Sequence, residues 1–530
     1  MIKLVCFGDS HIHRKAGFNE EAFNNGVSAI NTSKADLVLF LGDLTMEGTE
    51  AEYKYALEKF SHFKPEAYPK MLIGNHDARN VGYELFESEI GPRNYIIDDI
   101  ENMVIVALDS TLPDLNSGRI GVPALKFAKK AFSQQDDVIK VLAFHHHVLP
   151  IPNTGRERSM VEDAGDVLEF ILQENIDIVC TAHRHFPNSY LIQDEDDTAV
   201  IINTGTFSAT KTRARAGCGF VSLELEKEPG EKGEVRVHTY KTSEGIEPEE
   251  RKHEIPPISR KFPVMRLKEE LGAKRISKII HISDTHFTEG KEFRVESFER
   301  AVELIETEAA DLIVHTGDVT AASQIEEFEL AVENLRRISD ILPIAVIPGH
   351  RDVWPIGRKL FEKEIGPINC LWEDPNLRIM GFNTSRPYTD AGNLGRSKLN
   401  MIIEDIGPFR QMGKFLFVAT HHSAVPLPTT RNVSTLEDSG EFIRTLVDWN
   451  VPFHLSGHNH SAFVVQVGNT LFCNAGTLSS SKMVSLERLN SYNTIEIYEN
   501  GYVQVTEVSV NTGKRYPLRA ATLPLPTLGI

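Results

Sequence analysis

Acidic side chains, histidines and an asparagine recur along the chain in short motifs of the kind that bind metal ions. Asp9-Ser10-His11 sets a carboxylate and an imidazole two positions apart, and Gly42-Asp43 supplies a second carboxylate. The remaining candidates are Asn75, His145, His183 and His185. Carboxylate, imidazole and amide groups together suit Mn, Fe, Zn, Co or Ni, whereas the absence of thiolates argues against a zinc-finger type of site. These residues predict a centre for divalent metal ions.

Each of these motifs occurs a second time at an almost constant offset. Asp284-Thr285-His286 lies 275 positions after the first motif, as Gly317-Asp318 does after Gly42-Asp43. The other counterparts are His350, His421, His458 and His460, of which only His421 departs from the offset, by one position. Because solenoid units are only about 20–50 residues long, so long a repeat indicates two copies of a whole domain.

The length of the chain agrees with a duplicated domain. Its 530 residues are too many for one hydrophobic core, and two units of about 260 residues lie near the upper size of a single domain. Residues 226–278 are polar and rich in Glu, Lys, Pro and Gly. We therefore expect an N-terminal domain over residues 1–260 and a C-terminal domain over residues 261–530.

Composition excludes several classes of protein. The chain carries 56 basic and 75 acidic side chains, and its net charge of −19 disfavours binding to an extended nucleic acid. Five cysteines form no C-x-x-C pair, and Cys6 and Cys180 lie in apolar runs, which favours buried, reduced thiols. No leader-like segment and no run of 18 apolar residues is found in the sequence. We expect a cytoplasmic protein without a membrane anchor.

Short apolar runs alternate with helical spacing in the first copy. The expected strands cover residues 4–7, 37–41, 71–73, 141–144 and 176–180, and the expected helices cover residues 20–30, 49–63 and 161–173. This alternation predicts an α/β sheet with helices outside it. Strand-like runs alone follow, at residues 189–193, 199–203, 220–226 and 235–240, and the second copy ends in the same way at 494–498 and 502–508.

The ligand-type residues stand directly after the expected strands. Asp9 follows the first strand, Asp43 the second and Asn75 the third, while His145 and His183 follow the last two. Ligands of open α/β sheets gather at the carboxyl ends of the strands. We therefore expect these side chains to converge on one rim of each copy.

The ordered series D-x-H, G-D, G-N-H-D, H and H-x-H resembles the signature of the calcineurin-like metallophosphoesterase superfamily. That resemblance implies a two-sheet β sandwich flanked by helices (αββα) in each of two tandem domains. The histidine pairs followed by Pro150-Ile151-Pro152 and Pro426-Leu427-Pro428 most resemble the branch that contains class III cyclic nucleotide phosphodiesterases. Neither copy has the tight H-H-P-P form of that branch.

The resemblance implies two divalent ions in each intact site, with Mn or an Fe/Zn pair favoured. The ligands of the first ion would be Asp9, His11, His185 and Asp43. The ligands of the second would be Asn75, His145, His183 and the same Asp43. A hydroxide bridging two ions about 3.5–4 Å apart would attack phosphorus in line. His76 would contact the phosphate and protonate the leaving oxygen, for roughly 10²–10⁴-fold in rate.

Departures from the family pattern are concentrated in the second copy. Its expected ligands are Asp284, His286, Asp318, His350, His421, His458 and His460. His350 replaces the asparagine ligand, and Arg351 replaces the proton donor. A guanidinium releases no proton near neutral pH, although Arg351 can still bind a phosphate of the substrate. In the first copy only Ala182 departs, because it stands where the family has a glycine.

The sequence therefore predicts a dinuclear metal-dependent phosphoesterase, with phosphodiesters such as cyclic nucleotides or small organic diesters as substrates and the N-terminal domain as the main catalyst. Two alternatives stay open: a phosphomonoesterase, and a nucleotide- or phosphate-binding scaffold with a degenerate second site. The expected partners are a small phosphoester and the second domain itself, in an intramolecular pseudo-dimer, with no membrane and no extended nucleic acid.

The pseudo-dimer predicts how the N-terminal domain behaves alone. A contact within a fused pair benefits from a high effective concentration, which separation removes. Residues 1–260 expressed alone should expose apolar surface and self-associate, as measured by light scattering. A monodisperse monomer with the hydrolytic activity of the whole chain would count against a substantial contact between the domains.

Overall fold

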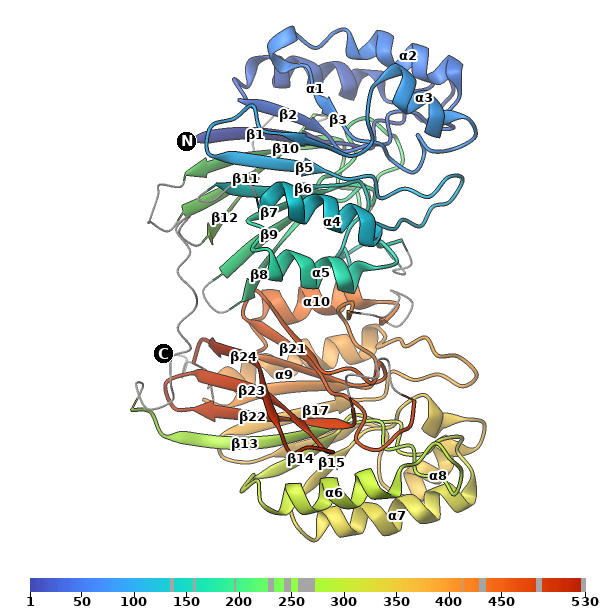
Figure 1. Cartoon of the computed structure of the whole chain (residues 1–530), viewed down its shortest axis with the longest axis vertical. Helices are drawn as coiled ribbons and strands as arrows, with labels where there is room; N and C mark the ends of the chain where they lie inside the picture. The colour runs from blue at the N-terminus through green and yellow to red at the C-terminus, as the bar shows by residue number, and fades with distance from the viewer. Residues whose placement is uncertain are drawn as a thin grey trace. The chain divides into compact units, whose positions relative to one another are not determined.

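The computed structural model describes residues 1–133, 138–155, 159–194, 197–226, 233–242, 249–255, 272–411, 413–428, 435–482 and 489–525. The chain divides into two compact units, Met1–Phe262 and Pro263–Ile530 (Figure 1). The expected boundary at residue 260 lies outside the described residues. None of the helices that the structure describes is both long and apolar enough to cross a membrane.

The first sheet of the N-terminal unit has the strand order β12-β11-β10-β1-β2-β3. Its strands are β1 (Ile2–Phe7), β2 (Leu37–Phe40), β3 (Lys70–Met71), β10 (Gly219–Glu226), β11 (Gly233–Lys241) and β12 (Glu249–Ile255). β1, β2 and β3 run parallel. On the other side of β1 the strands alternate in direction, because β10 pairs antiparallel with β1, β11 with β10, and β12 with β11. The carboxyl ends of the three parallel strands therefore lie at the same edge of the sheet.

The second sheet of this unit has the order β8-β9-β7-β6-β5-β4. Its strands are β4 (Tyr95–Ile97), β5 (Met103–Ala107), β6 (Ile139–Ala143), β7 (Ile178–Thr181), β8 (Asn188–Asp194) and β9 (Asp197–Asn203). β5, β6, β7 and β9 are parallel to one another, and β4 and β8 are antiparallel to their neighbours.

Alternate side chains of each strand enter different cores. Leu4 and Cys6 of β1 pack with Val141 of β6 in the core between the sheets. Val5 and Phe7 point the other way, as the two-residue period of a strand requires, and pack under three helices. Those helices are α1 (Glu20–Thr32), α2 (Glu50–Phe60) and α3 (Gly82–Glu89), while α4 (Gly121–Phe132) and α5 (Ala164–Gln173) contact β5 and β9 of the second sheet. The order helices, sheet, sheet, helices in Figure 1 confirms the expected αββα fold.

The C-terminal unit repeats this architecture. Its sheets have the orders β15-β14-β13-β22-β23-β24 and β16-β17-β18-β19-β21-β20. The strands of the first are β13 (Arg275–Ile282), β14 (Leu312–His315), β15 (Ile344–Val346), β22 (Ser491–Tyr498), β23 (Tyr502–Ser509) and β24 (Arg515–Thr522). Those of the second are β16 (Cys370–Glu373), β17 (Leu377–Phe382), β18 (Phe415–Thr420), β19 (Phe453–Ser456), β20 (Phe463–Val467) and β21 (Thr470–Asn474). The helices are α6 (Val295–Glu306), α7 (Ile325–Ser339), α8 (Gly357–Glu364), α9 (Arg396–Gln411) and α10 (Ser439–Asp448).

The expected elements of the first copy are present, and the structure adds α3, α4, β4 and β5, which the sequence did not predict. The strand expected at residues 71–73 is the two-residue β3, because the chain then turns into the loop that carries Asn75. β12 lies inside the segment that the sequence marks as a polar connection. Its backbone pairs with β11 in an antiparallel ladder, so backbone hydrogen bonds define this strand instead of an apolar pattern.

Candidate metal centre

Five strands carry the predicted site of the N-terminal unit at their carboxyl ends. Asp9 and His11 follow β1, Asp43 follows β2, and Asn75 with His76 follows β3. The second sheet contributes His145 after β6, and His183 with His185 after β7. All of these residues lie in clusters whose ligand atoms are close enough to hold a metal ion, apart from the amide of Asn75, which contacts the same cluster. The predicted convergence on one rim is therefore present.

One group of donors surrounds a first position. His11 Nε2 lies 3.1 Å from His185 Nε2 and 3.5 Å from Asp43 Oδ2. Asp9 Oδ1 lies 3.4 Å from His185 Nε2 and 3.8 Å from His11 Nε2. Donors bound to one ion at about 2.0–2.1 Å in a tetrahedron lie about 3.4 Å apart, so these separations fit a single cation.

A second position shares Asp43 with the first. Asp43 Oδ2 lies 3.4 Å from His145 Nε2, which in turn is 3.1 Å from Asn75 Oδ1. His183 Nδ1 closes the group at 2.9 Å from Asn75 Oδ1 and 3.2 Å from His145 Nε2. The carboxylate of Asp43 thus faces both groups, as a bridging ligand must.

Buried polar atoms without hydrogen-bond partners support cations at these positions. Asp9 Oδ1 and its counterpart Asp284 Oδ1 accept no hydrogen bond from any described residue. Buried charges are normally paired or coordinate metal ions. Imidazole nitrogens that face one another at 3.1 Å are likewise explained by an ion between them. The donor set therefore fits the divalent ions that the sequence predicts.

The backbone holds five of the proposed ligands in an unusual conformation. Asp9, His11, Asp43, His183 and His185 have φ values of 51°, 45°, 61°, 74° and 54°. Side chains other than glycine are uncommon in this left-handed region, and such residues gather where function requires a fixed geometry. The five counterparts in the C-terminal unit, Asp284, His286, Asp318, His458 and His460, have the same conformation.

Hydrogen bonds behind the histidines fix which nitrogen faces the cluster. His145 Nδ1 donates to the Leu41 carbonyl at 2.7 Å, and His185 Nδ1 donates to the Lys211 carbonyl at 2.7 Å. Each bond leaves Nε2 with its lone pair directed at the proposed ion. Asp43 is oriented similarly, since its Oδ1 accepts the His76 backbone N–H at 2.8 Å.

Asp77 holds the loops together and contacts neither proposed position. Its carboxylate accepts hydrogen bonds from the backbone N–H groups of Leu44, Thr45 and Gly74 and from the Thr45 hydroxyl. Burial and the charge of Asp43 raise the pKa of Asp77 to about 6. The aspartate of the G-N-H-D motif therefore positions Asp43 and Asn75.

Charges within the cluster are strongly coupled. Burial alone would raise the pKa of Asp43, but the His145 and His76 imidazoles hold that pKa well below its usual value. Burial opposes protonation of His145, yet the neighbouring Asp43 raises its pKa to about 9. A divalent ion must displace this proton, so metal affinity should rise with pH up to that range.

His76 lies beside the proposed ions. Its Nδ1 donates to the Met46 carbonyl at 2.7 Å, so Nε2 is the nitrogen that can face a substrate. Arg79 Nη2 lies 3.4 Å from Nε2 and donates to Asn116 Oδ1 at 3.0 Å. Sequence reasoning missed Arg79 and Asn116, although Arg79 follows the G-N-H-D motif by two positions.

Ala182 has a compensating partner. Its Cβ faces Gly8, where a methyl group would lie 3.0 Å away. In the C-terminal unit the small and large residues are exchanged, since Ser283 corresponds to Gly8 and Gly457 to Ala182. A side chain at Gly457 would collide with Ser283. The departure at Ala182 is therefore accommodated without moving the ligands.

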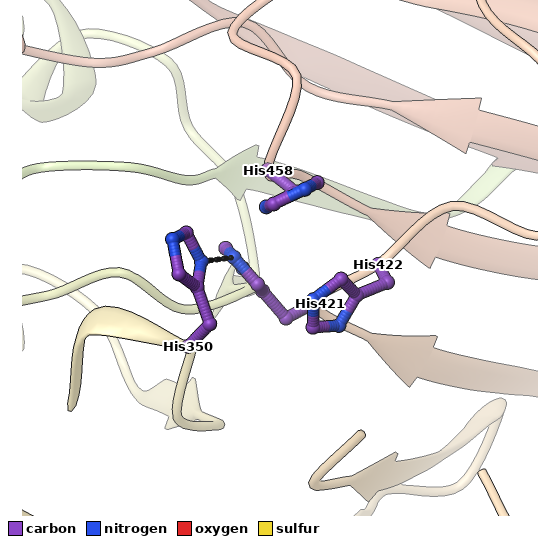
Figure 2. A group of neighbouring side chains, drawn as sticks. All are labelled: His350, His421, His422 and His458. Carbon is purple, nitrogen blue, oxygen red and sulfur yellow. Dashed lines mark hydrogen bonds between the residues drawn. The ribbon is translucent and has the colours of Figure 1, made fainter. Parts of the chain in front are cut away.

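The C-terminal unit assembles its predicted residues in the same arrangement. His286 Nε2 lies 3.1 Å from His460 Nε2 and 3.7 Å from Asp318 Oδ2, and Asp284 Oδ1 is 3.2 Å from His460 Nε2. At the second position His350 Nδ1 lies 3.1 Å from Asp318 Oδ2 and 3.2 Å from His421 Nε2. Figure 2 shows His350, His421 and His458 around this position, with His422 beside them. Arg351 takes the place of His76, and its backbone N–H donates to Asp318 Oδ1 at 2.8 Å.

Comparisons with known proteins follow the same division. A family model described as calcineurin-like phosphoesterase matches residues 2–187 and 277–462. The chain is 25% identical over 200 residues to a probable cyclic nucleotide phosphodiesterase of Xenorhabdus bovienii, covering 35% of this chain and 79% of that protein. It is 32% identical over 157 residues to a probable glycerophosphodiester phosphodiesterase of Arcobacter nitrofigilis, covering 27% and 56%. It is 26% identical over 169 residues to a 3',5'-cyclic adenosine monophosphate phosphodiesterase of Pseudomonas aeruginosa, covering 28% of this chain and 57% of that protein.

Solved structures resemble the chain only distantly. A dimetal phosphatase of Danio rerio is 9% identical with a TM-score of 0.38, over 47% of this chain and all of that one. A purple acid phosphatase of yellow lupin is 12% identical with a TM-score of 0.38, and the match covers 56% of this chain and 60% of that one.

The four hydrogen bonds of Asp77 lead to a prediction about stability. Asp77→Ala leaves three buried backbone N–H groups and a hydroxyl without their acceptor, which should destabilise the N-terminal unit by at least about 2–4 kcal/mol. Thermal unfolding followed by circular dichroism should show a lower midpoint temperature for the unfolding transition of the N-terminal unit. Asp352→Ala should do the same to the C-terminal unit, because Asp352 makes the matching bonds to Val319, Thr320 and Gly349. Unchanged transitions in both variants would refute this role.

Proposed function

Because the chain belongs to the calcineurin-like phosphoesterase family, we propose that its N-terminal unit hydrolyses phosphodiesters with the help of two divalent metal ions. The observation that carries the proposal is the sharing of Asp43 between two complete groups of donors, next to His76, whose Nε2 lies beside the guanidinium of Arg79. Cyclic nucleotides and small organic diesters are the proposed substrates. The names of the related phosphodiesterases support a diester over a monoester.

Each residue of the N-terminal site has a distinct proposed task. A bound pair of divalent ions would supply neutralisation of phosphoryl charge and a lowered pKa of water. The seven side chains Asp9, His11, Asp43, Asn75, His145, His183 and His185 would hold those ions. Asp43, held by the His76 N–H, would fix the distance between the two positions.

His76 is the proposed proton donor. The Met46 carbonyl occupies its Nδ1–H, so protonated His76 would present Nε2–H to the leaving oxygen. Arg79, next to that nitrogen, is placed to bind a phosphoryl oxygen through its guanidinium. Arg79 would orient the ester, and His76 would protonate the alkoxide as the P–O bond breaks.

The C-terminal unit has a different proposed role, that of binding. Arg351 occupies the backbone position of His76, since the N–H of each residue donates to the bridging aspartate at 2.8 Å. A guanidinium there can bind a phosphate but cannot protonate an alkoxide. We therefore propose that this unit binds a phosphoester or phosphate and contributes little to turnover.

Two further proposals rest on the sequence alone. One is the intramolecular pairing of the two units, which the long repeat suggests. The other is a cytoplasmic location, for which the support is the composition and the reduced cysteines.

The bridging role of Asp43 predicts a large loss of hydrolysis. Asp43→Asn removes one negative charge from both positions at once and should reduce turnover of a phosphodiester at least about 100-fold. Asp318→Asn is the matched control, because it makes the same change in the C-terminal unit and should leave most turnover intact. Both variants would be assayed with added Mn²⁺. If Asp43→Asn kept wild-type turnover, the two-metal proposal for the N-terminal unit would fail.

The proposed acid role of His76 predicts a dependence on the leaving group. His76→Ala should reduce hydrolysis of an alkyl phosphodiester by about 10²–10⁴-fold, yet reduce hydrolysis of an activated aryl ester much less, because an aryl oxide leaves without a proton. Arg351→Ala should change alkyl turnover little. The reverse result, in which Arg351→Ala removes alkyl turnover and His76→Ala does not, would place the working site in the C-terminal unit.

A further inference from the structure

We propose that the C-terminal unit is a metal-retaining centre, which binds its ions more tightly than the N-terminal unit and favours Zn²⁺ over Mn²⁺. The inference rests on the metal ligands proposed above. It adds to them a supporting carboxylate, Glu292, and a preference for zinc. Two differences between the copies carry it: a carboxylate behind one proposed ligand, and an imidazole in place of an amide.

Glu292 supports a proposed ligand in the C-terminal unit alone. Its Oε1 lies 2.9 Å from His286 Nδ1, on the side of the ring away from the proposed ion, and its Oε2 lies 2.8 Å from Lys482 Nζ. The His286 side chain is only 2% exposed. In the N-terminal unit Gly17 occupies the equivalent position, so no carboxylate side chain is available there for His11.

A carboxylate behind a metal-bound histidine fixes the ring and makes its other nitrogen a stronger donor. Loss of such a partner typically costs about 10–100-fold in metal affinity. The first position of the C-terminal unit therefore has a positioning residue that its N-terminal counterpart lacks.

The second position differs in the donor itself. His350 Nδ1 lies where the N-terminal unit has Asn75 Oδ1, at 3.1 Å from Asp318 and 3.2 Å from His421 (Figure 2). With His458, whose Nδ1 is buried and accepts no hydrogen bond from a described residue, three imidazoles and one carboxylate surround this position. The N-terminal position has two imidazoles, an amide and a carboxylate.

Imidazole nitrogen and amide oxygen favour different metal ions. Imidazole suits Zn, Cu and Ni, whereas oxygen donors suit Mn and Mg. Three imidazoles and a carboxylate are the donors of many tetrahedral zinc sites, and the separations among His350, His421 and the two oxygens of Asp318, 3.1–3.4 Å, are close to the edge of such a tetrahedron. Exchange of the amide for His350 thus shifts the preference away from Mn²⁺.

His422 belongs to the same cluster but serves as support. Its Nδ1 bonds to the Thr384 hydroxyl at 2.9 Å, and its Nε2 donates to the Asp390 carbonyl at 3.1 Å. Both ring nitrogens are engaged, so His422 is not a ligand. The carboxylate of Asp390 lies 3.5 Å from His350 Nε2, but its side chain is 77% exposed, so it adds little to the support of His350.

Metal counting on the whole chain tests the proposal independently of hydrolysis. The protein would be loaded with equal amounts of Zn²⁺ and Mn²⁺, dialysed against increasing concentrations of a chelator and analysed by plasma mass spectrometry. We expect the last ion retained to be zinc. It should disappear in Asp318→Asn and remain in Asp43→Asn. Retention that depends on Asp43 instead would overturn the proposal, as would a last ion that is manganese.

Two conservative variants test the two differences separately. Glu292→Gln should weaken zinc retention by about 10–100-fold, whereas Glu289→Gln, an exposed residue nearby, should not. His350→Asn should raise the Mn²⁺ content relative to Zn²⁺ and change the visible spectrum of the Co²⁺-substituted protein. Folding of each variant would be checked by circular dichroism.

The metal-binding proposal and the phosphodiesterase proposal can fail independently of each other. Unchanged retention and metal ratio in both folded variants would refute the inference even if the protein hydrolyses diesters. Retained zinc in a protein without hydrolytic activity would support the inference and refute only the proposed function.

Discussion

A buried carboxylate shared between two groups of imidazoles is the constraint on which the rest of each unit depends. Asp43 and Asp318 lie out of solvent, and each faces histidines from both sheets of its unit. A buried anion of this kind is stable only with compensating positive charge. The αββα fold serves this need, because the carboxyl ends of parallel strands in two sheets open toward one another. Left-handed backbone at the residues after those strands then turns the side chains inward.

Much of this arrangement could be predicted from the sequence, because ligand chemistry and strand position are both local properties. The repeat, the αββα fold and the convergence of the predicted residues are present in the structure. The sequence did not reveal the positive φ angles, because Asp and His adopt left-handed backbone more often than other residues but still only in a minority of cases. It also did not reveal the anchoring by Asp77, which depends on a contact between two loops 32 or 33 residues apart. Glu292 was missed although it lies in the same loop as His286, because no motif marks their contact. The glycine at the matching position 17 is what marks the difference between the copies.

The two copies show that the scaffold tolerates large chemical changes close to its site. His281, His315 and His454 of the C-terminal unit are buried where the N-terminal unit has Cys6, Phe40 and Val179. Threonine hydroxyls partner all three: His281 with Thr316, His315 with Thr285, and His454 with Thr420. Burial lowers the pKa of each, to about 3 or 4, so these imidazoles are neutral in the core. Paired exchanges such as Gly8 with Ala182 for Ser283 with Gly457 let the sequence diverge without displacing the ligands.

We propose that each unit holds a pair of cations on either side of one aspartate. Anomalous X-ray diffraction from crystals of the metal-loaded whole chain would locate these ions. We expect two peaks about 3.5–4 Å apart in the N-terminal unit, both adjacent to Asp43, with a matching pair at Asp318. A single peak bound away from Asp43, or peaks that are coordinated by His76 or Asp77, would contradict it.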